Sequence, residues 1–264
     1  MSAATQARQA ELDQVLDNQD VVAALADELF AVVELLSGQV SLRNALSDAT
    51  AGETARRELA TAVLGGKVST ATQSVVEAAA GLRWASGADL TAALERQGVR
   101  ALLRGAQLGK RLDAVEEELF RFSRIVDADH GLRDVLEDRS ASLTGREELV
   151  GALLAGKAED ATIALGKRAL RAANRTFART LDSYLALAAA ERSRAIAEVT
   201  VARPLTDDQA ERLREALSRQ VGREVTLQIS VDPAVIGGVR VKLGDEVIEG
   251  TVAGRLEAAE RQLN

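Results

Sequence analysis

The chain has 264 residues, of which 47% are hydrophobic and 28% charged, and its formal net charge is −7 at pH 7. This negative charge argues against electrostatic binding of nucleic acid or anionic lipid by the chain as a whole. The lack of cysteine excludes disulfides and thiolate chemistry and is typical of a reducing compartment. The N-terminal residues lack an apolar signal core, and no apolar run approaches the roughly 20 residues of a membrane helix. We therefore expect a soluble intracellular protein.

Residues 1–194 carry helical periodicity that is interrupted by short breaks of glycine, serine, threonine and aspartate. Apolar residues spaced three and four apart predict helices because they share one helix face. Gly65-Gly66 is typical of a helix stop. The helices predicted in this way include Leu12–Leu16, Val21–Leu36, Leu59–Val63, Val75–Val76 and Leu90–Leu94.

The same sequence pattern returns about ninety residues later without a gap. The matching segments are Glu28–Phe30 with Glu118–Phe120, Leu42–Leu46 with Leu132–Leu136, Arg56–Leu59 with Arg146–Leu149, Leu64–Lys67 with Leu154–Lys157, and Ala71-Thr72 with Ala161-Thr162. Composition bias alone does not readily produce a constant offset of this length. We interpret the pattern as two copies of one helical bundle, each long enough to bury its own core.

After Arg194 the hydrophobic period changes to one that mixes strands and helices. Thr206 and Gln209 have the spacing of a capping box at the start of a helix that ends at Gly222. Apolar residues that alternate with polar ones predict strands. The predicted strands are 196–201, 225–229, 239–243 and 247–248, and a last helix is predicted from Thr251 to Leu263. The order is β-α-β-β-β-α.

These patterns predict a mainly α protein with three parts. An N-terminal helical bundle covers residues 1–100, a second and similar six-helix-type bundle covers 101–194, and a small α/β domain covers 195–264.

The C-terminal segment contains a dense series of residues in a fixed order. They are Val231, Asp232, Pro233, Gly237, Gly238, Gly244, Asp245, Val247, Ile248, Gly250, Thr251, Val252, Arg255 and Leu256. This order and spacing resembles the C-terminal signature of the delta subunit of F-type ATP synthase, the counterpart of the mitochondrial oligomycin-sensitivity-conferring protein. Glu249 departs from the aspartate that is frequent in that family, but it keeps the charge. From about residue 100 onward, the chain resembles the usual delta subunit, so residues 1–100 would be an extra, degenerate copy of its bundle.

The resemblance implies a non-catalytic stator subunit without a cofactor, present in one copy per complex. Its expected partners are the N-terminal helices of the alpha subunits and the C-terminal end of the b subunit. Membrane association, at the cytoplasmic face of the bacterial plasma membrane, would come only through the complex. A freestanding helical scaffold or regulatory protein is the main alternative, and a small-molecule enzyme is a more distant one.

Residues of the kinds that serve catalysis are scarce. His130 is the single histidine, so we do not expect a zinc site or a histidine-dependent triad. We expect His130 to have a surface or capping role. Gly65-Gly66-Lys67 lacks the first glycine and the Ser or Thr of a phosphate loop. Trp84 and Tyr184 are expected to be packing residues.

Two segments are candidates for partner binding. The basic run of Lys167, Arg168, Arg171, Arg175 and Arg179 would place four arginines on one face if a single helix spanned them. Such a face is either a solvated surface or a docking stripe for an acidic partner, and with only Phe177 available for stacking, nucleic acid is not expected. In the predicted last helix, Leu256, Ala259 and Leu263 form a narrow apolar seam that could contact either the end of b or the domain's own sheet.

Overall fold

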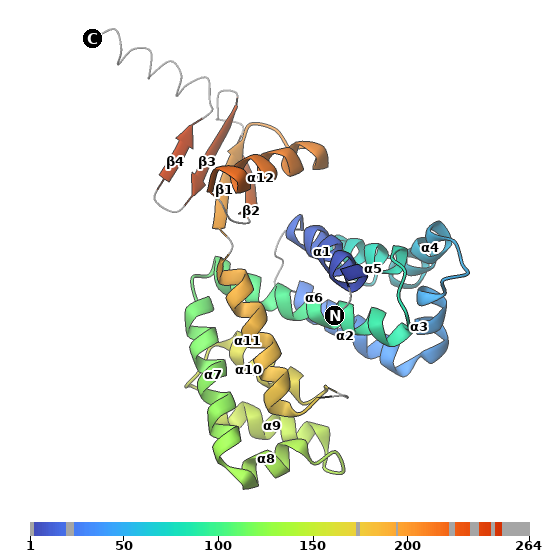
Figure 1. The fold of residues 1–264 in the computed structure, drawn as a ribbon, viewed down its shortest axis with the longest axis vertical. Helices are drawn as coiled ribbons and strands as arrows, with labels where there is room; N and C mark the ends of the chain where they lie inside the picture. Colours follow the sequence, from blue (N-terminus) through green and yellow to red (C-terminus); the bar gives the residue numbers. More distant parts are fainter. Residues whose placement is uncertain are drawn as a thin grey trace. The chain divides into compact units, whose positions relative to one another are not determined.

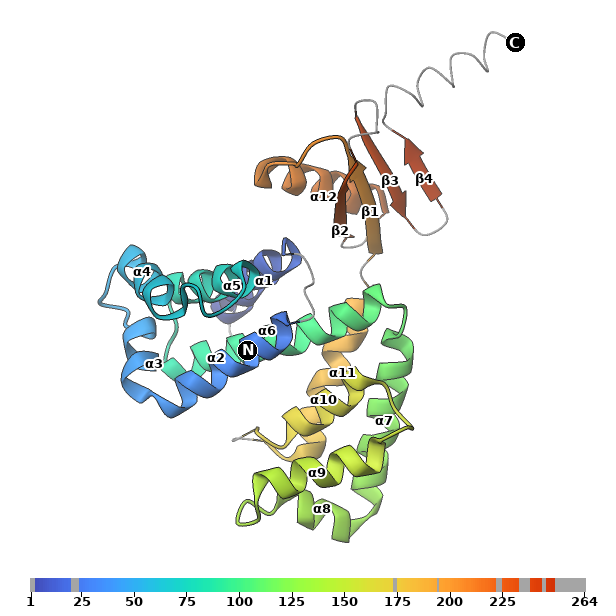
Figure 2. The ribbon, with the colours of Figure 1, turned by 180° about the vertical axis from the view of Figure 1, so that it is seen from behind.

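The structure is a computed structural model that describes residues 3–19, 24–172, 175–193, 195–221, 225–232, 238–243 and 246–249. The chain forms two compact units (Figures 1 and 2). The first holds the described parts of Met1–Leu16 and Val21–Arg192, and the second holds those of Ser193–Asn264 with the short segment Asp17–Asp20.

The first unit is helical. Its helices are α1 (Ala3–Asp17), α2 (Leu25–Gly38), α3 (Val40–Ser47), α4 (Glu53–Leu64), α5 (Thr70–Gly81), α6 (Gly87–Leu108), α7 (Leu112–Ala128), α8 (His130–Glu137), α9 (Leu143–Leu154), α10 (Asp160–Ala169) and α11 (Phe177–Ser193). Polar caps and glycines set several of these boundaries. Ser69 accepts a hydrogen bond from the Thr72 amide at the start of α5, and Gly66 has a φ of 70° just after α4 ends.

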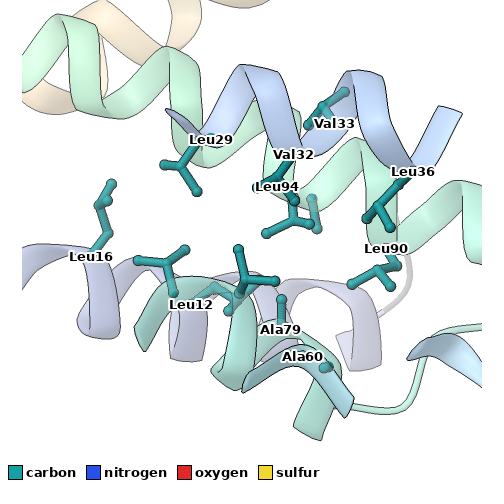
Figure 3. Packing of buried hydrophobic residues seen from close by; sticks show 14 of the residues in the cluster. Leu12, Leu16, Leu29, Val32, Val33, Leu36, Ala60, Ala79, Leu90 and Leu94 are labelled. Atoms are coloured by element: carbon teal, nitrogen blue, oxygen red, sulfur yellow. The ribbon is translucent and has the colours of Figure 1, made fainter. Parts of the chain in front are cut away.

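Helices α1 to α6 enclose the first hydrophobic core. Figure 3 shows the leucines and valines of α1, α2 and α6 pointing toward one another, with Ala60 and Ala79 lying where α4 and α5 approach. The small alanines allow these two helices to pack closely. The fully buried side chains include Leu12, Leu16, Leu29, Leu36, Leu90 and Leu94. Burial of each such leucine contributes about 1.5–3 kcal/mol.

A second core lies among α6 to α11. It contains Leu119 and Phe122 of α7, and the Phe122 ring meets that of Phe177 edge to face with centroids 5.7 Å apart. Helix α6 contributes Leu94 to the first core and Leu103 to the second. The predicted boundary between residues 100 and 101 thus falls inside one continuous helix of 22 residues.

Helix boundaries in the two halves of this unit recur at a constant offset. Helices α3, α4 and α5 begin at Val40, Glu53 and Thr70, and α8, α9 and α10 begin ninety positions later at His130, Leu143 and Asp160. Gly156 after α9 has a φ of 68°, close to the 70° of Gly66.

The second unit contains a four-stranded sheet in the order β2-β1-β3-β4 and a helix. Its elements are β1 (Ala195–Val201), α12 (Asp207–Val221), β2 (Val225–Val231), β3 (Val239–Leu243) and β4 (Glu246–Glu249). Strands β1 and β2 are parallel, whereas β3 is antiparallel to both β1 and β4. Leu217 of α12 packs against Val199 and Val241, so the helix covers one face of the sheet (Figure 1).

The sequence-based prediction of this region agrees with the described elements. The Thr206 amide donates to the Gln209 side chain and the Gln209 amide donates to the Thr206 hydroxyl, at 3.0 and 3.3 Å, which is the predicted capping box. The predicted hairpin is present as β3 and β4. The predicted last helix lies outside the described residues.

Candidate partner-binding site

The basic run 167–179 does not lie on one helix. Helix α10 ends at Ala169 and α11 begins at Phe177, so the condition under which its four arginines would share one face, a single helix spanning them, is not met. No glycine or proline marks this break. The structure instead divides the arginines into two groups with different surroundings.

Arg168 is buried and joins three helices of the first unit. Its Nε donates to the Glu95 carboxylate at 2.7 Å, and one terminal nitrogen donates to Glu34 at 2.7 Å. The guanidinium also stacks on the ring of Phe30, 4.6 Å from the centroid. Burial alone would lower the pKa of Arg168, but the hydrogen bonds and charges of Glu95 and Glu34 raise it above its ordinary value.

Arg171 lies in the same junction. It pairs with Glu34 at 3.1 Å and with Glu147 at 2.8 Å. Arg168 and Arg171 therefore bind acidic groups of the chain itself and connect α10 to α2, α6 and α9. Both arginines thus form ion pairs within the molecule. The sequence offered no sign of these pairs because Glu34 and Glu95 are far away along the chain.

Arg175 and Arg179 lie elsewhere, at a pocket of about 420 Å³ in the second core region. We call it the arginine pocket, since Arg139, Arg146, Arg175 and Arg179 all line it. The other lining residues are Leu136, Glu137, Ala169, Leu170, Ala172, Thr176 and Phe177. These come from α8, from the end of α10 and from the start of α11.

A buried ionic network that the sequence analysis missed connects α1, α6 and α11. Arg100 is 1% exposed; it lies 2.9 Å from Asp13 of α1 and donates from Nε to Glu191 of α11 at 2.7 Å. Arg96 and Gln97 also donate to Asp13. Burial alone would raise the pKa of Asp13, but these partners lower it. Arg96 and Arg100 are four residues apart, which indicates a shared helix face but gives no sign that the face is buried.

A glutamate of α2 and a glutamate of α7 each bind the N-terminus of a later helix. The Glu28 carboxylate accepts hydrogen bonds from the Ser69 amide at 3.0 Å and from the Thr72 hydroxyl. Ninety positions later, Glu118 accepts from the Glu159 amide at 2.9 Å and from the Thr162 hydroxyl. Burial would raise the pKa of Glu28, and the hydrogen bonds from Ser69 and Thr72 lower it. A carboxylate suits a helix N-terminus because it complements the free amides there.

The residues considered as weak candidates for catalysis or ligand binding serve as helix caps, lie on the surface or are buried in the cores. Lys67 donates to the Val63 carbonyl at 2.9 Å and so caps α4. His130 is exposed beside Arg133 at the start of α8, where Asp129 provides the cap. Trp84 and Tyr184 are buried, and burial raises the pKa of Tyr184. Among the described residues, no group of three or more His, Asp or Glu side chains is placed to hold a metal ion.

Part of the C-terminal series lies in the sheet unit. Asp232 follows β2, and its amide donates to the Val201 carbonyl at 2.9 Å. Gly238 has a φ of 97° just before β3, a conformation that favours glycine. Ile248 lies in β4 opposite Val241. The members outside the described residues are Pro233, Gly237, Gly244, Asp245, Gly250, Thr251, Val252, Arg255 and Leu256, as are Ala259 and Leu263 of the seam.

Comparison of the sequence with known proteins shows the family of the chain. The sequence pattern of the ATP synthase delta (OSCP) subunit matches residues 95–263. The chain belongs to the ATP synthase delta (OSCP) subunit family. Members of this family are components of the peripheral stalk and do not carry out the catalysis. The resemblance inferred from the C-terminal series is confirmed.

Full-length relatives extend the similarity beyond the family match. The chain is 43% identical over 255 residues to ATP synthase subunit delta of Cutibacterium acnes, with 96% of each chain covered. It is 41% identical to that of Nocardia farcinica, over 99% of this chain and 97% of the relative. The protein of the same name from Streptomyces griseus is 44% identical, with 96% and 94% covered. The segment before residue 95 is therefore shared with these delta subunits.

A solved structure, the "Cryo-EM structure of Toxoplasma gondii mitochondrial ATP synthase hexamer, composite model", contains a chain that aligns with 62% of this chain and 94% of its own length. Its identity is 18% and its TM-score is 0.27, a value that establishes no shared fold. Within the part of the chain that the structure describes, no helix has the length and apolar content needed to cross a bilayer.

Proposed function

We propose that the chain joins the catalytic head of a bacterial F-type ATP synthase to its peripheral stalk and thereby couples proton transport to ATP synthesis. The observation that carries this proposal is the identity of 41–44% with ATP synthase subunits delta over nearly the whole chain. A freestanding scaffold or regulator would not require such a relationship from end to end.

A stator must transmit torque without deforming, and the helical unit has features that suit this task. Helix α6 has 22 residues and therefore spans about 33 Å at ~1.5 Å per residue. It supplies side chains to both cores, and Arg100 ties it to α1 and α11. A force applied to one half would reach the other through a continuous helix instead of a flexible linker.

The proposed organisation has three parts, 1–100, 101–194 and 195–264, with α6 shared by the first two. We interpret the first two as copies of one six-helix-type bundle. This interpretation is supported by the recurrence of helix starts at an offset of ninety residues and by the matching hydrogen bonds of Glu28 and Glu118.

The proposed partners follow from the family. The bundles would hold N-terminal helices of the alpha subunits, and the C-terminal domain would hold the C-terminal end of the b subunit. Helix-in-groove contacts at several points would give an avidity that no single contact provides. One copy would serve each complex, at the cytoplasmic face of the plasma membrane, and membrane association would depend on the complex.

Leu263 provides a test of the proposed contact with b, because the spacing of Leu256, Ala259 and Leu263 predicts an apolar seam. Burial of one leucine contributes about 1.5–3 kcal/mol, and an interface depends on a few such anchors. We expect Leu263→Asp to weaken binding of a peptide from the C-terminal end of b by at least about tenfold, equivalent to ~1.4 kcal/mol. The measurement is calorimetric titration of the full chain.

Gln262→Asp is the matched control, since it adds the same charge one position outside the seam spacing. It should bind the peptide as the parent does. If Leu263→Asp binds normally while Arg175→Glu abolishes binding, the contact lies on the helical unit and the proposal is wrong. In a separate NMR titration of the labelled chain, a peptide from the alpha N-terminus should shift resonances of residues before 193, and not those of β3 and β4.

A further inference from the structure

Arg146 and its counterpart ninety positions earlier, Arg56, have different surroundings. Arg56 is buried and donates to five backbone carbonyl groups, from Nε to Ala80 at 2.7 Å and from its terminal nitrogens to Asp48, Ala51, Gly81 and Leu82. Every nitrogen of this guanidinium is satisfied. Helix α5 supplies the essential acceptors because its final turn ends beside the guanidinium.

In the second half of the helical unit, α10 does not supply Arg146 with the carbonyl acceptors that α5 supplies to Arg56. Helix α5 has 12 residues, whereas α10 has 10 and so ends two residues earlier. Arg146 is only 8% exposed; it donates to the Leu136 carbonyl at 3.0 Å, and its Nε is buried without a hydrogen-bond partner. A buried guanidinium nitrogen without an acceptor is costly, and such a group calls for an explanation.

This guanidinium lines the arginine pocket, whose other charged residues are mostly cations. Arg139, Arg175 and Arg179 are exposed around it, and Glu137 is its one lining carboxylate. Glu137 already accepts from the Phe177 amide at 3.1 Å, and the neighbouring Asp138 side chain, whose charge also acts on Arg146, accepts from Ser140. The start of α11, a helix of 17 residues, also faces the pocket and adds the positive end of its dipole.

We propose that the arginine pocket binds a small phosphate-type oxyanion, with the buried Arg146 as its anchor and the exposed arginines around it. Four guanidinium groups against two carboxylates that already accept hydrogen bonds, Glu137 and Asp138, favour a divalent anion over a single carboxylate, and guanidinium forks match tetrahedral oxyanions. The net charge of −7 repels a polyanion such as nucleic acid, whereas a small ion senses the charges within about 8 Å at physiological salt. This proposal does not rest on the proposed contacts with the alpha and b subunits.

The test is a titration of the full chain with inorganic phosphate at constant ionic strength, followed by NMR of the arginine Nε–H groups. The Arg146 signal should shift saturably, because a bound anion changes the electrostatic surroundings of a guanidinium that lines the pocket. A second titration with adenosine monophosphate shows whether the pocket prefers a phosphate ester or free phosphate. The double variant Arg175→Gln and Arg179→Gln should weaken binding by at least about tenfold through loss of two charge-assisted contacts.

Arg121→Gln is the matched control, since it removes one exposed charge from α7 away from the pocket and should leave phosphate binding unchanged. Arg175 and Arg179 are exposed, so their variant should melt like the parent without phosphate. An Arg146 signal that does not shift up to high phosphate, or an equal loss of binding in Arg121→Gln, would overturn the proposal.

Discussion

Replacement of Arg100 by methionine tests whether the buried ionic network holds the helical unit together. The guanidinium lies between Asp13 and Glu191, whose side chains are 13% and 4% exposed. Methionine keeps most of the apolar volume but leaves the Glu191 carboxylate buried without this cation. Loss of one partner from a buried pair costs about 3–5 kcal/mol, compared with about 0.3–0.5 kcal/mol for an exposed pair on one helix. We therefore expect the free energy of unfolding to fall by about 3–5 kcal/mol.

Urea denaturation followed by circular dichroism measures this loss. Arg57→Met is the control, since Arg57 pairs with Glu53 on the surface of α4. Adding Glu191→Gln to Arg100→Met should recover part of the lost stability because it removes the uncompensated charge. If Arg100→Met lowers the free energy of unfolding by no more than Arg57→Met does, the network contributes little to stability. The interpretation of α6 as a rigid connection would then lose its support.

Two further predictions concern the same unit. The pKa of Asp13 is lowered in the folded chain, so its contribution is present above the unfolded value of about 3.9 and is lost as pH falls through the folded value. Asp13→Asn should therefore flatten the fall in stability on acid titration, and an unchanged acid slope would contradict this. A Cβ at Gly98 would lie 2.5 Å from the Phe30 ring, so Gly98→Ala should cost about 1–3 kcal/mol, whereas Gly38→Ala, with nothing within 4 Å, should not destabilise the chain. Equal melting temperatures for the two alanine variants would refute the close packing of α6 on α2.

The sequence predicted most where the local pattern and the fold agree. Val239, Val241 and Leu243 alternate with Arg240 and Lys242, and this alternation suffices for a strand with one covered face. The Thr206 capping box is likewise a local feature, since both hydrogen bonds join residues three apart.

Long-range burial of charge limited the prediction elsewhere. Helix α6 was anticipated only around Leu90–Leu94, because the buried Arg96–Arg100 turn contains polar residues that interrupt the apolar period. The basic run looked free of acidic partners, since Glu34 and Glu95 approach Arg168 only after the chain folds. The two halves of the helical unit differ at Arg56 and Arg146 although the residue type is the same, because the ends of α5 and α10 differ.

Co-purification from membranes is the most direct test of whether the chain is a stator subunit of an ATP synthase. The chain, tagged and expressed in its own bacterium, is isolated from detergent-solubilised membranes and the bound proteins are identified by mass spectrometry. We expect to recover the alpha and b subunits together with the rest of the ATP synthase, at one copy of this chain per complex. Recovery of the chain without other ATP synthase proteins, while a tagged alpha subunit prepared in parallel retains the complex but lacks this chain, would contradict this expectation.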